Sequence, residues 1–345
     1  MRSTLATANR QWRLVSRPIG MVGTEHFALS EAPVPEPADG QILVRVLYVS
    51  FDPAMRAFLH DRPSYVPPQP VGAVMRAGGI GQVIDSRHPS FSPGELVLAG
   101  VGWQEYAVVS GAAVATTLDP RRPPTDYLSV LGGTGLTAYF GLLDVGSVKP
   151  RETVVVSGAA GATGSTAVQI ARILGCRTIA IAGGPQKARW TVEELGADAA
   201  VDYKHDAVAE RLTALCPDGI DVYFDNVGGD ILQAAIGRMK MHGRIVLCGM
   251  ISTYNDAQPS PGPNNLFELV ARRVRMQGFL VSDYASRFGE ARQALEQWLD
   301  AGVLRAHVDV QEGFERIPAT FLRIFTGANV GKQTLKLAEP PLPVR

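Results

Sequence analysis

The sequence predicts an α/β protein of two domains, in which a β-rich domain precedes a doubly wound parallel sheet. Its 345 residues give room for two domains of about 100–200 residues each. Short strand patterns broken by proline and glycine fill residues 1–129, which is typical of a compact barrel-like domain. From residue 153 onward strand patterns alternate with helical patterns, which favours a parallel sheet covered by helices.

The composition is typical of a soluble globular protein with a sizeable core, with 46% hydrophobic and 19% charged residues. The chain has 33 lysine and arginine residues and 33 aspartate and glutamate residues, so it has no net charge that would attract nucleic acid or an anionic membrane. A local patch of positive charge is not excluded by these totals. No apolar run approaches the ~20 residues of a membrane span, and residues 1–12 lack a signal-peptide core. Cys176, Cys216 and Cys248 are widely spaced, which predicts a reducing cytoplasm and neither a disulfide framework nor a zinc knuckle.

Within the first domain, residues 41–50 have the strongest strand pattern, a nearly continuous apolar and β-branched run. Further strands are expected at residues 79–85, 95–99 and 105–109. The proline-rich stretch 63–70 is expected to be an ordered loop, because strand patterns resume directly after it.

In the second domain the expected elements follow one another closely. A small-residue segment and a helical pattern occupy residues 128–142. Strands are then expected at 177–182, 199–202, 219–225 and 244–249, and helices at 185–195, 207–215 and 231–239. The remaining expected elements are a helix at 264–273, a strand at 276–281, a helix at 287–301, a strand near Val308, a helix at 317–325 and a strand at 332–337. The tail 339–345 holds three prolines and is expected to fray.

The segment Thr153–Gly164 has the pattern of a dinucleotide-binding turn. Its run Val154–Val156 is typical of a parallel strand buried on both faces, glycines spaced three apart follow, and Ser165–Leu174 then has helical periodicity. Glycines let the backbone approach a pyrophosphate, and the helix N-terminus directs free N–H groups at it. A glycine triplet also fits a surface turn, but the flanking strand and helix favour the fingerprint. The candidate contacts are Gly158, Ala160, Gly161, Ala162, Thr163 and Gly164.

The residues after the second strand favour NADP over NAD. An NAD enzyme places Asp or Glu about 20 residues beyond the glycines, where it binds the ribose hydroxyls. No residue from Ile181 to Lys187 is acidic. Lys187, with Arg189 behind it, can neutralise a 2′-phosphate instead; the alternative is that Lys187 is an ordinary solvated helix residue.

Several strings of residues form a pattern along nearly the whole chain. They are Asp52-Pro53, Met55-Arg56, Trp103–Tyr106, Ala159–Ala162, Tyr223–Gly229, Cys248–Asn255 and Gly327–Lys332. Together they resemble the zinc-independent medium-chain dehydrogenase/reductase superfamily. Within it, the chain is similar to the NADP-dependent alkenal/enone reductases, which include prostaglandin reductases and bacterial curcumin reductases. The strings Phe224–Gly229 and Ile251–Asn255 are much more specific than the glycines alone.

The resemblance implies a fold of two lobes. Residues 1–129 and 311–345 would form a GroES-like catalytic and substrate domain, and residues 130–310 a Rossmann NADP-binding domain, with NADPH in the cleft. The resemblance also implies a homodimer that pairs through the Rossmann lobe. The apolar run 276–281 is compatible with extending a sheet across such a dimer, and equally with burial inside its own lobe.

The resemblance further implies which residues hold NADPH. Lys187 and Tyr203 would contact the 2′-phosphate, with a packing role as the alternative for Tyr203. For Asn226 the alternative is a turn-stabilising side chain, and Cys248 is expected to be a small buried thiol that contacts the cofactor through its backbone. The implied contacts to the rest of the dinucleotide are Asn226, Cys248, Gly249, Ile251, Ser252, Thr253, Tyr254, Phe279, Leu280, Val281 and Asn329.

The chain lacks the ligands of the zinc alcohol dehydrogenases, which have a similar fold. It has no cysteine before Cys176, and its six histidines show no ligand spacing. We therefore expect no metal site, and simple alcohol oxidation is disfavoured.

Conjugate reduction is the reaction that this sequence favours. NADPH would give hydride to the β-carbon of an α,β-unsaturated aldehyde or ketone, and the developing enolate oxygen needs a hydrogen-bond donor. Tyr254 is the candidate donor, because a phenol can hold an oxyanion and relay a proton; the alternative is that it only packs against the cofactor. The resemblance implies that the nicotinamide ribose hydroxyl shares this role and that Tyr65 lines the substrate pocket, with a loop anchor as the alternative for Tyr65.

Two other functions stay open. One is NADPH:quinone reduction within the same superfamily, which the glycine fingerprint does not exclude and which Ile251–Asn255 and Tyr65 disfavour. The other is NADPH binding without catalysis, against which the intact fingerprint, Lys187 and Tyr254 argue. In each case the expected partner is a small molecule, and neither nucleic acid nor a membrane is expected.

Overall fold

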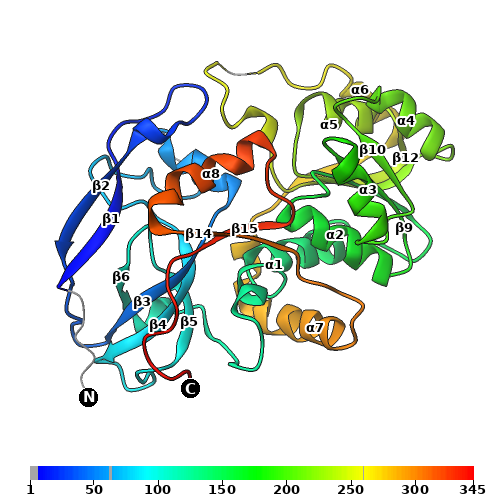
Figure 1. The fold of residues 1–345 in the computed structure, drawn as a ribbon. Helices are drawn as coiled ribbons and strands as arrows, with labels where there is room; N and C mark the ends of the chain where they lie inside the picture. Colours follow the sequence, from blue (N-terminus) through cyan, green and yellow to red (C-terminus); the bar gives the residue numbers. More distant parts are fainter. Residues whose placement is uncertain (1–6, 62–63, 259) are drawn as a thin grey trace. The chain divides into compact units, whose positions relative to one another are not determined.

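The chain folds into two units, each with its own β-sheet (Figure 1). The structure is a computed structural model that describes residues 7–61, 64–258 and 260–345. The first unit comprises Met1–Leu128, Asp309–Asn329 and Gln333–Arg345, and the second comprises Ser129–Val308 and Val330–Lys332. Among the described residues, no helix has both the length and the apolar character needed to cross a bilayer.

The second unit is built on a parallel sheet with the strand order β10-β9-β8-β11-β12-β13 (Figure 1). Counted from β8, this order is 3-2-1-4-5-6, that of the doubly wound Rossmann fold, so the predicted fold class is confirmed. The order reverses between β8 and β11, and ligands of such sheets bind beside that switch point at the carboxyl ends of the strands. The strands are β8 Thr153–Ser157, β9 Arg177–Ala182, β10 Ala199–Asp202, β11 Ile220–Asp225, β12 Met239–Leu247 and β13 Arg275–Gly278.

The helices of this unit bury the apolar side chains of the sheet. Val155 and Tyr223 from the strands form one buried cluster with Leu212 of α4 and Ile236 of α5. α1 packs against α2 and α7. The helices are α1 Gly133–Phe140, α2 Ala162–Ile173, α3 Pro185–Glu193, α4 Val208–Leu215, α5 Gly229–Ile236, α6 Phe267–Arg272 and α7 Phe288–Asp300.

One helix boundary differs from the expectation. The helix expected at 231–239 is α5, which begins at Gly229 and ends at Ile236, because Met239 already opens β12. Met239 is buried and pairs with Ile220 of β11, so sheet pairing prevails over the helical pattern of the sequence.

The last strand of the sheet is also shorter than expected. The predicted strand 276–281 is β13, which ends at Gly278, and Val281 opens the 3-10 helix Val281–Arg287. The ring of Phe279 packs edge-on toward Tyr284, with 6.4 Å between the centroids. This contact packs the residue after Gly278 against the 3-10 helix and not in the sheet.

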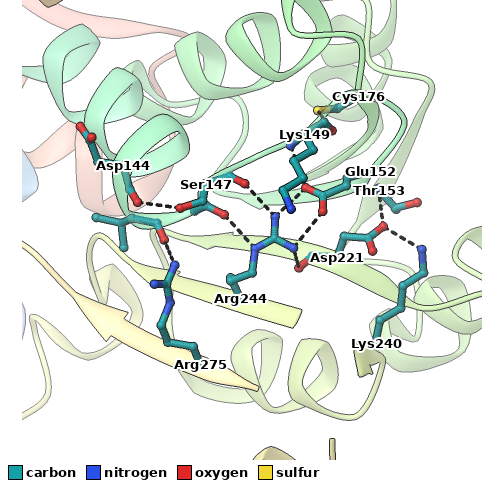
Figure 2. Close-up of polar contacts among 12 residues, drawn as sticks. Asp144, Ser147, Lys149, Glu152, Thr153, Cys176, Asp221, Lys240, Arg244 and Arg275 are labelled. Carbon is teal, nitrogen blue, oxygen red and sulfur yellow. Dashed lines mark hydrogen bonds and ion pairs between the residues drawn. The ribbon is translucent and has the colours of Figure 1, made fainter. Parts of the chain in front are cut away.

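Polar side chains join the amino ends of several strands of the parallel sheet (Figure 2). Arg244 of β12 donates to both carboxylate oxygens of Glu152, at 3.0 and 2.5 Å. Lys240 binds Asp221 at 2.7 Å, and the same carboxylate accepts the N–H of Thr153 at 2.8 Å. These contacts tie β8, β11 and β12 together at the edge opposite to the glycine turn.

The first unit is β-rich, as predicted. Its main sheet has the order β14-β15-β3-β4-β5-β7, and β6 pairs with β3. A hairpin of β1 and β2, which the sequence did not indicate, pairs from Ala8 with Pro33 to Leu14 with Phe27. The elements are β1 Ala8–Leu14, β2 Phe27–Pro33, β3 Gln41–Ser50, β4 Gly78–Ser86, β5 Leu96–Gly100, β6 Tyr106–Ser110, β7 Thr116–Thr117, β14 Val308–Glu312, α8 Ile317–Thr326 and β15 Lys332–Lys336.

An aromatic cluster fills the core of the first unit. Trp103 is fully buried, and the rings of Phe27, Phe51 and Phe321 lie 4.9, 5.9 and 5.5 Å from its ring, centroid to centroid. The cluster joins β2, the end of β3 and α8, and such aromatic contacts contribute beyond the area that they bury.

The tail that we expected to fray is instead fixed to the sheet. The buried side chain of Gln82 on β4 donates to the carbonyl oxygen of Leu342 and accepts its N–H, both at 2.9 Å. The N–H of Arg345 bonds to the carbonyl oxygen of Gly94 at 3.3 Å. A side-chain amide thus takes the place of a strand partner for the extended, proline-rich chain.

Candidate functional site

The glycine turn joins β8 to α2 at the switch point of the parallel sheet. Gly158 has a φ of +58°, a left-handed conformation that favours glycine. The N–H of Gly161 bonds to the carbonyl oxygen of Gly158 at 2.9 Å, and the N–H of Ala159 bonds to that of Ile181 in β9 at 3.0 Å. The turn therefore lies at the edge where dinucleotides bind in such sheets.

Helix α2 begins directly after this turn. Gly161 is its extended N-cap residue, and the first helical bond reaches back to the Gly161 carbonyl oxygen at 2.8 Å. The N–H groups of Ala162, Thr163 and Gly164 are thus those that a helix leaves for an outside acceptor. A Cβ on Gly164 would lie 2.2 Å from the carbonyl oxygen of Gly158, so only glycine lets α2 begin this close to the turn.

A second turn, Asn226–Gly229, follows β11 and lies against the glycine turn. A Cβ on Gly158 would be 3.3 Å from the Cβ of Asn226. The side-chain amide of Asn226 donates to the carbonyl oxygen of Ser157 at 2.7 Å. This bond gives Asn226 a turn-stabilising role and uses only the nitrogen of its carboxamide.

The buried carboxylate of Asp225 holds the second turn and β8 together. Its Oδ1 accepts the hydroxyls of Ser157 and Tyr223 at 2.8 and 3.0 Å, and the N–H groups of Val227 and Gly228 at 3.1 Å each. A buried charge needs such donors to offset the loss of its water. Burial, with Asp225 adding to it, raises the pKa of Tyr223 well above its usual value of 10.0.

The loop Cys248–Tyr254 extends β12 at the same edge of the sheet. The N–H groups of Cys248 and Gly249 bond to the carbonyl oxygen of Asp225 at 2.9 and 3.0 Å. The loop then forms the 3-10 helix Ile251–Thr253. Within it, the Ser252 hydroxyl donates to the carbonyl oxygen of Val227 at 2.6 Å, which fixes the loop to the second turn.

Tyr254 folds back over this loop. Its hydroxyl accepts the N–H of Met250 at 3.2 Å and lies 3.3 Å from where a Cβ on Gly249 would be, so a larger residue at position 249 would press on the phenol oxygen. Burial raises the pKa of Tyr254 above its usual value of 10.0; the Met250 N–H opposes this effect, and Cys248 and Asp225 add to it. The phenol is therefore protonated throughout the neutral pH range. Among the described residues, the Met250 N–H is the partner that the structure gives this hydroxyl, so the hydroxyl proton is left to donate.

Cys248 is a thiol without nucleophilic character at neutral pH. Burial, with Asp225 adding to it, raises its pKa to about 12. Cys248 as a residue is only partly buried, and its N–H bonds to the carbonyl oxygen of Asp225, so a backbone contact with the cofactor stays a prediction.

Lys187 and Tyr203 lie at the carboxyl ends of β9 and β10. Helix α3 begins at Pro185, so Lys187 belongs to its first turn, and Tyr203 directly follows β10. A Cβ on Gly183 would be 2.7 Å from the Tyr203 hydroxyl, so the phenol covers the turn that leads into α3. Tyr203 is 43% exposed, which leaves much of its ring accessible to a ligand.

The remaining predicted site residues lie in two places. Phe279, Leu280 and Val281 follow β13 in the second unit. Tyr65 and Asn329 belong to the first unit, where Tyr65 is 54% exposed and Asn329 is buried.

The segment Val330–Lys332, which directly follows Asn329 in the sequence, belongs to the second unit. There the N–H of Gly331 bonds to the carbonyl oxygen of Ala160 in the glycine turn at 2.8 Å. The string that ends in Val-Gly-Lys thus contributes backbone to the glycine turn.

Comparisons with known proteins agree with this arrangement. Family models described as "N-terminal domain of oxidoreductase" and "Zinc-binding dehydrogenase" match residues 10–117 and 162–299. The chain is 40% identical to the NADPH-dependent curcumin reductase of Escherichia coli over 335 residues, which cover 96% of this chain and 97% of that protein. It is 37% identical to prostaglandin reductase 1 of Bos taurus over 337 residues, 95% of this chain and 98% of that protein. The chain belongs to the medium-chain dehydrogenase/reductase family of NADP-dependent alkenal and enone reductases.

A solved relative extends the likeness to three dimensions. The crystal structure of CurA from Vibrio vulnificus in complex with NADPH matches this reductase with a TM-score of 0.91 and 40% identity, over 96% of this chain and all of that one. Both the β-rich unit and the Rossmann unit lie within the matched range.

Sequence patterns missed two polar residues of this reductase that organise the site. The sequence string Phe224–Gly229 marks the place of Asp225, but it does not show the four bonds that the Oδ1 of Asp225 accepts. Asp202 was not singled out; it ends β10 and accepts the N–H of Gly184 in the turn before α3 at 2.6 Å. The only signal for Asp202 was its position, an acid at a strand end directly before Tyr203.

The described residues of the reductase contain no group of three or more His, Cys, Asp or Glu side chains placed to hold a metal ion. All three cysteines are free, and Cys176 donates to the carbonyl oxygen of Lys149 at 3.3 Å, as Figure 2 shows.

Proposed function

We propose that this reductase uses NADPH to reduce the carbon–carbon double bond of α,β-unsaturated aldehydes and ketones. The observation on which the proposal rests is Tyr254, a protonated phenol at the switch-point edge of the sheet, with its proton left to donate. The relatives support it, because they are named for reductions of curcumin, prostaglandins and 2-alkenals.

The second unit has the features that NADPH requires. The left-handed Gly158 and the free N–H groups at the start of α2 suit a pyrophosphate, and Lys187 with Tyr203 suits the 2′-phosphate. The loops that hold Asn226, Gly249 and Ile251–Thr253 lie along the same edge and would contact the nicotinamide half, together with 279–281 and Asn329. When bound, NADPH supplies the hydride.

Tyr254 is the proposed donor to the substrate oxygen. Its hydroxyl would bind the carbonyl oxygen and stabilise the negative charge that develops there as the enolate forms. A phenol whose pKa is raised keeps its proton until that charge appears, and it can then relay a proton. Tyr65, exposed on its loop, is proposed to line the substrate pocket.

We propose that the reaction needs no metal and that the protein works in a reducing cytoplasm. The first 175 residues contain no cysteine, so the thiolate ligands of a zinc alcohol dehydrogenase are lacking there. The three free thiols agree with a reducing compartment. Turnover that persists after dialysis against a chelator would support the metal-free reaction.

A homodimer through β13 is part of the proposal. β13 ends the strand order of the sheet and pairs with β12 on one side, and all four of its residues are exposed. The strand is thus available to extend the sheet and is not buried within its own unit. An open edge of this kind readily pairs with another strand.

The test of the reaction follows NADPH absorbance with a medium-chain 2-alkenal, an aryl enone and a simple quinone, with NADH in parallel. We expect rapid loss of NADPH with the enones, a saturated carbonyl product by mass spectrometry, and a much slower reaction with NADH. Reaction with the quinone alone would assign the protein to NADPH:quinone reduction. Binding of NADPH without any turnover would identify a binding protein.

A further inference from the structure

Asp202 ends β10 next to the residues proposed to hold the 2′-phosphate. It is 9% exposed, and both of its carboxylate oxygens bind groups of the protein. Oδ1 accepts the N–H of Gly184 at 2.6 Å and that of Lys204 at 3.1 Å. Oδ2 lies 2.6 Å from Nδ1 of His205.

These bonds join two turns that meet at the corner of the sheet. Gly184 has a φ of +91° and belongs to the turn that leads from β9 into α3. The first helical turn of α3 contains Lys187. Tyr203 belongs to the turn after β10, and its N–H bonds to Ala182 of β9 at 3.1 Å. The relative position of Lys187 and Tyr203 therefore depends on the carboxylate that fastens one turn to the other.

Asp202 does not fit the role of a ribose-binding acid. In NAD enzymes such an acid offers its oxygens to the ribose hydroxyls. Here Gly184, Lys204 and His205 already occupy them. Burial by itself would raise the pKa of Asp202, but the bonds from His205, Gly184 and Lys204 hold it below its usual range, so the group is ionised at neutral pH.

We propose that Asp202 is a positioning residue that gives this reductase its preference for NADPH over NADH. It fixes the Gly183–Gly184 turn beneath Tyr203, so that Lys187 and Tyr203 meet the 2′-phosphate together. This inference rests on the proposed placement of the 2′-phosphate beside Lys187 and Tyr203. Asp202 itself touches neither the phosphate nor the substrate.

A positioning role and a purely electrostatic role predict opposite effects. A carboxylate close to a phosphate repels it, so loss of the charge alone would tighten NADPH binding. Loss of the bonds to Gly184 and Lys204 would loosen both turns and weaken the binding of any ligand that needs them aligned.

The experiment measures dissociation constants of NADPH and NADH by fluorescence, and of adenosine 2′,5′-bisphosphate and 5′-AMP by calorimetry. Asp202→Ala is expected to weaken NADPH and the bisphosphate about tenfold, and to change NADH and 5′-AMP less than about twofold. Asp202→Asn keeps an oxygen that can accept both N–H groups, so its NADPH constant should stay within about twofold of the parent. The kcat at saturating NADPH should be unchanged in both variants.

Asp198→Ala is the matched control. Asp198 directly precedes β10, and its carboxylate binds the N–H and the hydroxyl of Thr178 at 2.7 and 3.2 Å, at the other end of the same strand pair. Its loss should leave the ratio of NADPH to NADH affinity unchanged. If Asp202→Ala does not fold, Asp202→Ser has the same expected result, because its side chain is too short to span Gly184 and His205.

Three results would overturn the inference: equal weakening of NADPH and NADH, tighter NADPH binding in Asp202→Ala, or the same loss of preference in Asp198→Ala. Lys187→Ala separates the inference from the proposed function. If Lys187→Ala loses the preference and Asp202→Ala keeps it, the positioning role alone fails. If Lys187→Ala keeps the preference, the 2′-phosphate binds elsewhere and both proposals fail.

Discussion

Tyr254 combines two properties that a donor to a developing oxyanion needs. Burial holds its pKa above 10.0, so the proton is present at neutral pH. Its hydroxyl oxygen is oriented by the Met250 N–H, which occupies a lone pair and not the proton. Orientation of a donor before the charge develops is the main source of its catalytic effect.

Tyr254→Phe is expected to lower kcat by roughly 10²–10³, the loss typical of one oxyanion donor, while the NADPH dissociation constant stays within about twofold. Steady-state kinetics and NADPH fluorescence measure the two quantities. Tyr139→Phe is the matched control, because burial also raises the pKa of Tyr139 and its hydroxyl contacts Glu290 at 3.4 Å. An unchanged kcat in Tyr254→Phe would exclude Tyr254 as the donor.

Single site residues could be predicted where they belong to a specific sequence string. They could not be predicted where their role depends on one hydrogen bond in the folded structure. Ile251–Asn255 pointed to Tyr254, and the strand-helix context of the glycines pointed to Gly158. Asp202 escaped because an acid at a strand end looks the same whether it faces a ligand or the N–H of Gly184.

At the scale of elements, the polar network in Figure 2 shows how the parallel sheet is held at its amino edge. Arg244 and Glu152 form a paired charge in which both side chains are mostly buried, at 16% and 17% exposure. Arg244 also donates to the carbonyl oxygens of Gly146 and Ser147, at 2.8 and 3.1 Å. One planar guanidinium therefore joins β12 to the loop before β8.

Arg244→Ala is expected to lower the free energy of unfolding by about 2–4 kcal/mol, because it leaves the Glu152 carboxylate without its partner in a mostly buried place. Urea unfolding measures this change. Arg244→Lys should recover little, since an ammonium cannot reproduce the forked contact. Arg287→Ala, which breaks the more exposed pairs with Asp144 and Glu290, should cost less than Arg244→Ala. Equal losses in the two alanine variants would contradict this account.

The ion pairs of Glu105, which directly precedes β6, connect it to β1 and β3 in the first unit and make the stability of that unit depend on pH. Glu105 binds Arg10 at 3.0 Å and Arg45 at 3.1 Å. Burial opposes ionisation, but the two guanidinium groups outweigh it, so the pKa of Glu105 lies below its usual value of 4.5. The stabilisation is fully present above pH 4.5 and is lost as the pH falls through the lowered pKa of the folded state.

Glu105→Gln should therefore be less stable than the parent at pH 7, and the difference should shrink as the pH is lowered below 4.5. Urea unfolding of both proteins between pH 7 and pH 3 measures it. If the difference in the free energy of unfolding stays constant over this range, the charge of Glu105 does not contribute, and the side chain stabilises the fold through its packing alone.

Helices and strands could be predicted where their own residues show a clear hydrophobic periodicity. The apolar run of β3 and the alternation of strands and helices from β8 to β11 gave close boundaries. The β1–β2 hairpin has polar side chains along its length, so its pairing is not visible in local pattern. The anchored tail depends on Gln82, a partner 260 residues away in the chain, which no local pattern can show.

At the scale of the whole molecule, the open edge of the Rossmann sheet is the surface through which the proposed homodimer would form. β13 exposes all four residues, including Met276 at 37%, and its one charged residue, Arg275, donates to the carbonyl oxygen of Val145. Natural sheets usually cover or charge such edges. Pairing with β13 of a second copy would cover this edge and join two sheets into one.

Gln277→Lys together with Met276→Lys should therefore convert a dimer to a monomer in sedimentation velocity, since like charges would meet across the strand pair. Val303→Lys, which charges another exposed apolar residue of the same unit, should leave the dimer intact. A parent protein that sediments as a monomer would exclude the paired edge.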